Sequence, residues 1–118
     1  MCHSSAVNIT VADDQRPIDD VVVVEGDLDA HTAPALRDRL DAVISRAPRR
    51  VLLVDLTAVP FLDSSGVGTL VAAHSRLVEG GASLRIVSTQ PRVLKVLSLT
   101  GLDSVIPTFP TVEAARGA

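Results

Sequence analysis

The sequence predicts a single α/β domain, with a mixed, mostly parallel sheet of about five strands and about four helices packed on it. Three short and largely apolar runs, at residues 21–26, 51–56 and 83–87, predict strands that are covered on both faces. Segments with helical spacing of apolar residues follow these runs, and strands that alternate with helices are typical of a parallel sheet. The length of 118 residues suits one domain with its own core.

The N-terminal part of the chain predicts one antiparallel pair within this sheet. Residues 6–12, AVNITVA, alternate in character and include β-branched side chains, which is typical of an edge strand. Residues 13–20 are polar and contain a proline, so we expect a loop or hairpin connection there. Because no helical segment separates this strand from the run at 21–26, the two should form an antiparallel hairpin.

The first helix is expected to begin at Thr32, whose hydroxyl suits an N-cap, with Pro34 tolerated in the first turn. Arg37 and Asp41 stand four residues apart on its exposed side, where they can form a weak ion pair. Residues 47–50 end the helix. Its predicted apolar face consists of Ala33, Leu36, Leu40, Val43 and Ile44.

The second helix is expected to begin with Ser64 as its N-cap and to close at Gly80 and Gly81. Helical spacing predicts one apolar face along it, formed by Val67, Leu70, Val71, Leu77 and Val78.

The C-terminal part predicts a third helix over residues 90–101, with Pro91 in its first turn and Gly101 just past its end. A last short strand at 104–107 and a short helix at 111–117 complete the predicted order.

The composition argues against several function classes. Aromatic residues make up 2% of the chain and the net charge is −3 without a basic patch, so nucleic-acid binding is disfavoured. The single cysteine, Cys2, cannot form an internal disulfide, and no Cys/His cluster indicates zinc. No apolar run approaches the roughly 18 residues of a membrane span, and the N-terminus lacks the pattern of a signal peptide. We therefore expect a soluble protein of the reducing cytoplasm.

Two loops are expected to carry functional groups, because in open sheets such groups gather at the carboxyl ends of strands. They are EGDLDAHT at 25–32 and TAVPFLDSSG at 57–66. A serine hydrolase is disfavoured, since LDSSG lacks the first glycine of a G-x-S-x-G elbow. Of the available histidines, His31 lies in the first loop, and His74 is expected to pack on the second helix with its hydrogen bonds satisfied.

The two loops do not match the common phosphate-binding motifs. No G-x-x-x-x-G-K-[ST] loop is present, and Gly66 and Gly68 lack the third glycine of a dinucleotide fingerprint. An acidic phosphoacceptor site stays open if the carboxylates converge, although the only lysine, Lys95, is not where a receiver-type domain would place one. The carboxylates concerned are Asp29, Asp55 and Asp63.

The stretch DSSGVG leaves a choice between a plain helix cap and a modification site at Ser64. A serine preceded by an aspartate is a common start of a helix. However, Gly66 and Gly68 each weaken the first turn by about 1 kcal/mol, which a simple cap does not require. Bare backbone there would let a partner protein approach an exposed hydroxyl, and a phosphate on it would add a charge of about −1.5 to −2.

The combination of these motifs resembles the STAS domain, the fold shared by anti-sigma factor antagonists and the tails of sulfate transporters. The resemblance covers roughly residues 6–115 and rests on GDLD at 26–29, DSSGVG at 63–68 and LSLTGL at 97–102. The likeness is to the stand-alone antagonists that regulate sporulation and general-stress sigma factors. It implies one STAS domain spanning residues 1–118.

The resemblance implies a partner switch rather than an enzyme. In that family the anti-sigma factor is a kinase with a histidine-kinase-like ATPase fold that uses ATP. Ser64 matches the serine that this kinase phosphorylates. Asp29 matches the acidic residue beside that serine. The unphosphorylated form would bind the anti-sigma factor and free a sigma factor, and a serine phosphatase would reset the switch. No cofactor, metal, nucleic acid or membrane is implied. The expected switch surface consists of Asp29, Asp63, Ser64, Ser65, Gly66 and Gly68.

The alternative function is that of a STAS module that does not switch. Such a module would serve as an accessory of a lipid or anion transporter, or as a scaffold in a sensory complex. The intact DSSG at residues 63–66 favours the antagonist.

Overall fold

The computed structural model describes residues 8–12, 19–45 and 51–117. Within them, one five-stranded sheet has the order β1-β2-β3-β4-β5. The first two strands pair antiparallel, and the later pairs are parallel, as the sequence predicted. The strands are β1 (Asn8–Ala12), β2 (Asp19–Glu25), β3 (Val51–Ala58), β4 (Ser83–Val87) and β5 (Thr108–Phe109).

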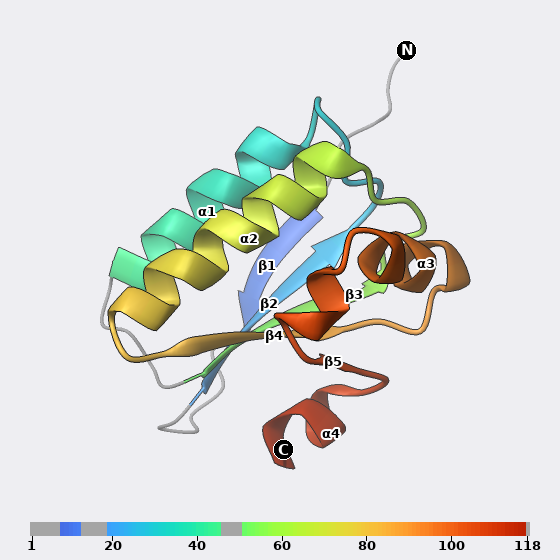
Figure 1. Cartoon of the computed structure of the whole chain (residues 1–118). Coiled ribbons are helices and arrows are strands. Elements are labelled where there is room, and N and C mark those ends of the chain that lie inside the picture. The colour runs from blue at the N-terminus through green and yellow to red at the C-terminus, as the bar shows by residue number, and fades with distance from the viewer. Residues whose placement is uncertain (1–7, 13–18, 46–50, 118) are drawn as a thin grey trace.

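Helices cover both faces of this sheet. Figure 1 shows α1 and α2 side by side across one face, with α3 next to them, and α4 on the opposite side. The four helices are α1 (Ala33–Ser45), α2 (Ser64–Glu79), α3 (Pro91–Leu99) and α4 (Val112–Gly117), and the short 3₁₀ helix η1 (Leu102–Ser104) follows α3.

The valines of β2 pack into two separate hydrophobic cores, one on each face of the sheet. Val22 and Val24 lie in the large core under α1, α2 and α3, whereas Val21 packs in a smaller core with Leu53, Val87 and Ala115. Neighbouring side chains of a strand point to opposite faces, so a strand covered on both sides needs a continuous apolar run. This confirms the prediction of a strand covered on both faces for residues 21–25, whereas Gly26 lies past the end of β2.

Two predicted boundaries were wrong. Residues 104–107 are not a strand: Ser104 ends η1, Ile106 is buried in the large core, and β5 begins only at Thr108, where it comes into register with Ile86. The strand β2 also begins earlier than expected, because Asp19 and Asp20 already pair with β3. The predicted strand residues 6 and 7, the loop residues 13–18 and the helix end at 47–50 lie outside the described residues.

The buried face of α2 differs from the predicted one. Val71 and Val78 are exposed, at 43% and 53% of their surface. The buried positions are Gly66, Leu70, Ala73 and Leu77, which alternate small and large residues against the sheet and α1. Across the α1–α2 contact, Asp41 forms an ion pair with Arg76 rather than with Arg37 of its own helix.

Candidate functional site

Backbone hydrogen bonds join the two candidate loops beyond the ends of β2 and β3. Leu28 donates to the carbonyl of Phe61 at 2.9 Å, and Asp63 donates to the carbonyl of Leu28 at 3.0 Å. This short parallel bridge follows a register shift between Val23 and Glu25 at the end of β2. The next residue, Gly26, adopts a φ of 102° that side-chain-bearing residues rarely take. The GDLD and DSSG motifs therefore lie side by side, as the sequence predicted.

The first loop is closed by the carboxylate of Asp29. Its Oδ1 accepts hydrogen bonds from the backbone N–H groups of His31 at 2.9 Å and Thr32 at 3.0 Å. The bond from Thr32 is the main cause that holds the pKa of Asp29 below its ordinary value; burial opposes it, and the bond from His31 adds to it. Asp29 thus holds the backbone that leads into α1. This structural role is the alternative to a direct role of Asp29 in the switch.

Thr32 precedes α1, as predicted, but its hydroxyl does not cap the helix. It donates to the carbonyl of Asp27 at 2.6 Å and accepts from the N–H of Asp29 at 3.0 Å. Both bonds stay within the loop, so they hold its turn closed and satisfy the hydroxyl of the buried Thr32.

The N-cap of α2 is Asp63, not Ser64 as the sequence indicated. Its carboxylate accepts from the backbone N–H groups of Ser65 at 2.8 Å and Gly66 at 3.3 Å. Aspartate at this position satisfies helix N–H groups and places a negative charge at the positive end of the helix. The hydroxyl of Ser64 is therefore not needed to start α2.

Ser64 is the first residue of α2 and is exposed. Its hydroxyl forms no hydrogen bond within the part of the chain that the structure describes. Ser65, by contrast, is half-buried and lines a cleft of about 420 Å³ between α1 and α2, together with Arg37 and Arg76. Of the two neighbouring serines, Ser64 is therefore the more exposed.

The two glycines of the motif have different surroundings. Gly66 is buried, and a Cβ atom there would overlap Cδ1 of Leu62 and lie 3.2 Å from Cβ of Leu28. Gly68 is exposed, and a Cβ there would meet nothing within 4 Å. Exposed backbone is therefore found at Gly68 and not at Gly66, where packing requires a glycine.

Asp55, the remaining candidate carboxylate, is hydrogen-bonded within its own strand β3. The carboxylate of Asp55 accepts from the backbone N–H and the hydroxyl of Thr57, at 3.0 and 2.7 Å. Among residues 8–12, 19–45 and 51–117, no three His, Cys, Asp or Glu side chains are grouped so as to hold a metal ion. His74 has a buried Nδ1 without a partner in these same ranges, so its expected hydrogen bond is not found.

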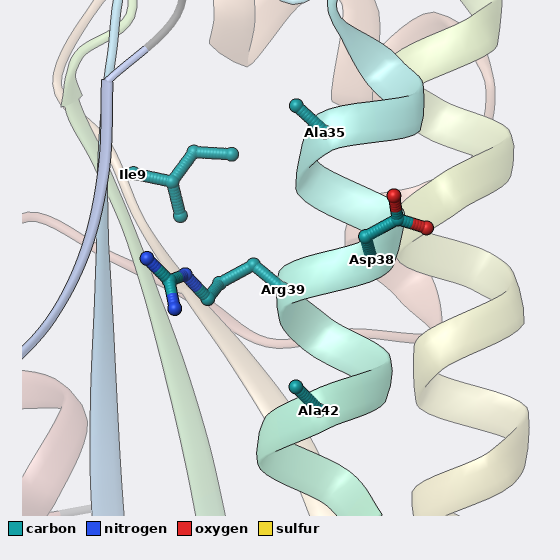
Figure 2. A pocket seen from close by; sticks show the side chains of 5 residues that line it. All are labelled: Ile9, Ala35, Asp38, Arg39 and Ala42. Carbon is teal, nitrogen blue, oxygen red and sulfur yellow. The ribbon is translucent and has the colours of Figure 1, made fainter.

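A second surface hollow, of about 440 Å³, lies between β1 and α1 (Figure 2). Its lining consists of Ile9, Ala35, Asp38, Arg39 and Ala42, none of which the sequence singled out as a site residue. Within the described part of the chain, no helix has the length and apolarity needed to cross a membrane.

Comparison with known proteins matches residues 11–115 to the family described as the STAS domain. The chain is 32% identical to the anti-sigma-B factor antagonist of Listeria monocytogenes over 101 residues, which are 85% of this chain and 88% of the relative. It is 30% identical to the anti-sigma-F factor antagonist RsfB of Mycobacterium tuberculosis over 115 residues, covering 98% and 91% of the two chains. The crystal structure of an anti-sigma factor antagonist from Mycobacterium paratuberculosis has a TM-score of 0.88 at 32% identity and covers 99% of this chain and 97% of its own.

The chain therefore belongs to the STAS domain family. Within that family, its relatives over nearly the whole length place it among the anti-sigma factor antagonists.

Proposed function

We propose that the unphosphorylated chain binds an anti-sigma factor and so frees a sigma factor, and that phosphorylation of Ser64 ends this binding. The anti-sigma factor is the kinase, with a histidine-kinase-like ATPase fold and its own ATP. A serine phosphatase restores the binding form. The chain is a binder and a substrate rather than a catalyst, needs no cofactor, and acts in the cytoplasm, where ATP is available.

The observation that carries this proposal is the placement of Ser64. Its hydroxyl is exposed and free of hydrogen bonds in the described residues, while the backbone around it is fixed by Asp63 and by the Leu28–Leu62 bridge. An exposed hydroxyl at the start of a well-anchored helix can enter a kinase active site without local unfolding. Gly68 supports the same reading, since its missing side chain has no packing reason and leaves the neighbouring surface flat.

The negative charge already present at the start of α2 favours a large loss of partner affinity on phosphorylation. The N–H groups of Ser65 and Gly66 already bond the carboxylate of Asp63, so a phosphate on Ser64 would not find them free. It would instead add about −1.5 to −2 charge next to that carboxylate. In a close interface, leaving such a charge desolvated and unpaired typically costs about 2–5 kcal/mol of binding free energy.

Mass spectrometry tests the proposal directly. The purified chain is mixed with ATP and each candidate anti-sigma kinase from the same genome. We expect one phosphate, located on Ser64 by peptide mapping, and none in Ser64→Ala. A phosphate found only on Ser65 would refute the site, and no phosphate with any of the kinases would favour a STAS module that does not switch.

A further inference from the structure

An apolar groove lies beside the β3–α2 loop that precedes Ser64. It has a volume of about 320 Å³ and is formed where the end of the β3–α2 loop meets α3. Its lining consists of Phe61, Leu62, Arg92, Lys95, Val96 and Leu99.

The walls of this groove are exposed yet firmly held. Phe61 and Leu99 expose 41% and 76% of their surface, although both are large apolar side chains. The carbonyl of Phe61 accepts from Leu28, and α3 is anchored in the core by Val93 and Leu97. Single exposed apolar residues are ordinary, but a clustered, preformed apolar groove is typical of an interaction site.

The charges at the groove define what it can accept. Arg92 and Lys95 line it, and the sequence of α3, PRVLKVLSL, contains no acidic residue. This local basic character stands against a net charge of −3 for the whole chain. An occupant that combines apolar and acidic side chains would match both the walls and the rim.

We propose that this groove holds an acidic amphipathic segment of the same anti-sigma factor that contacts Ser64. The inference rests on the proposed function and extends it. Phe61 and Leu62 directly precede Asp63 and Ser64, so the groove is continuous with the proposed switch surface. The contact then has two parts: the region of Ser64 responds to charge, and the groove supplies apolar contact that phosphorylation leaves in place.

Binding measurements with groove variants test this division. Leu99→Ser and Lys95→Glu change exposed side chains, so the melting temperature should stay near that of the wild type. Calorimetry with the anti-sigma factor that phosphorylates the chain should show at least tenfold weaker binding for each variant. The matched controls are Val78→Ser and Arg39→Glu, which make the same kinds of change at an exposed valine and an exposed arginine outside the groove. Both controls should bind the anti-sigma factor like the wild type.

The outcomes separate this inference from the proposed function. If the wild type binds and Ser64→Asp does not, while Leu99→Ser and Lys95→Glu bind normally, the groove inference is wrong and the proposed function stands. If the wild type binds none of the kinases, the proposed function fails and the groove inference fails with it.

A photo-crosslinking residue at position 99 identifies the occupant. We expect it to join a segment of the anti-sigma factor that is rich in acidic and apolar residues. A crosslink to a basic segment, or a Leu99-dependent dimer of this chain in sedimentation, would overturn the inference.

Discussion

Gly66 lies so close to Leu62 that a Cβ atom on the glycine would overlap the Cδ1 of the leucine. The same added atom would lie 3.2 Å from Cβ of Leu28. The start of α2 is thus pressed against the bridge that joins the two loops, and the bridge fixes where Ser64 stands. A glycine that looks like part of a partner surface in the sequence belongs to the framework of the site.

Replacing each glycine of the motif separates packing from exposure. Gly66→Ala should lower the free energy of unfolding by up to about 2 kcal/mol, because overpacking typically costs about 1–3 kcal/mol and the higher helix propensity of alanine offsets roughly 1 kcal/mol of that cost. Gly68→Ala, where nothing lies within 4 Å, is the matched control and should raise stability by up to about 1 kcal/mol. Urea unfolding measures both; equal effects would contradict the assigned roles.

The cap of α2 can be tested in the same way. Asp63→Ala removes the acceptor for the N–H groups of Ser65 and Gly66 and should cost about 1 kcal/mol of stability. Ser64→Ala removes a hydroxyl without a partner in the described residues, so stability should change by less than about 0.5 kcal/mol. A larger loss for Ser64→Ala than for Asp63→Ala in thermal unfolding would restore Ser64 as the cap.

The sequence was sufficient for the order of strands and helices, because that order depends on strong local patterns. The valines of β2 predicted a strand covered on both faces, and Pro91 and Gly101 bounded α3 closely. The position of β5 could not be read in this way. It depends on the register with Ile86 and Val87, which is a tertiary contact between segments distant in the chain.

The candidate site was predicted in outline, but the roles within it were not. The two motifs lie together as expected, since both follow neighbouring parallel strands. Whether Asp63 or Ser64 caps α2 depends on one backbone conformation, which spacing does not reveal. The groove was missed because nothing in the local sequence marks the apolar residues Phe61 and Leu99 as exposed, which only the fold shows.

Two substitutions of Asp29 separate its structural role from its charge. Asp29→Asn keeps an acceptor for the N–H groups of His31 and Thr32, whereas Asp29→Ala removes it. If charge near Ser64 matters for the kinase, both variants should slow phosphorylation in a timed assay with the anti-sigma factor. Slowing by Asp29→Ala alone would mean that Asp29 acts only by shaping the loop.

The same residue predicts a pH dependence. The pKa of Asp29 is lowered in the folded state, so its contribution to stability is complete above the unfolded-state value of about 4 and is lost as the pH falls through the folded-state value. A carboxyl titration of Asp29 followed by NMR should therefore have its midpoint below that of an unfolded peptide. A midpoint above it would contradict the hydrogen bonds assigned to the loop.

Phosphorylation should leave the fold unchanged. Leu70 and Leu77 anchor α2, and each fully buried leucine contributes about 1.5–3 kcal/mol, while the exposed Ser64 displaces nothing when it is modified. NMR spectra of the two forms should differ only around residues 29 and 63–68. Widespread shifts along α2, or loss of its helical signals, would mean that the switch works by refolding.

The central claim is that phosphorylation of Ser64 changes partner affinity by local charge and bulk. The direct test is calorimetry of the anti-sigma factor with the unmodified chain and with the chain phosphorylated on Ser64 alone, as verified by mass spectrometry. We expect the phosphorylated form to bind at least about 30-fold more weakly, which corresponds to the lower end of about 2 kcal/mol for a mispaired interfacial charge. Equal affinity of the two forms would contradict the account.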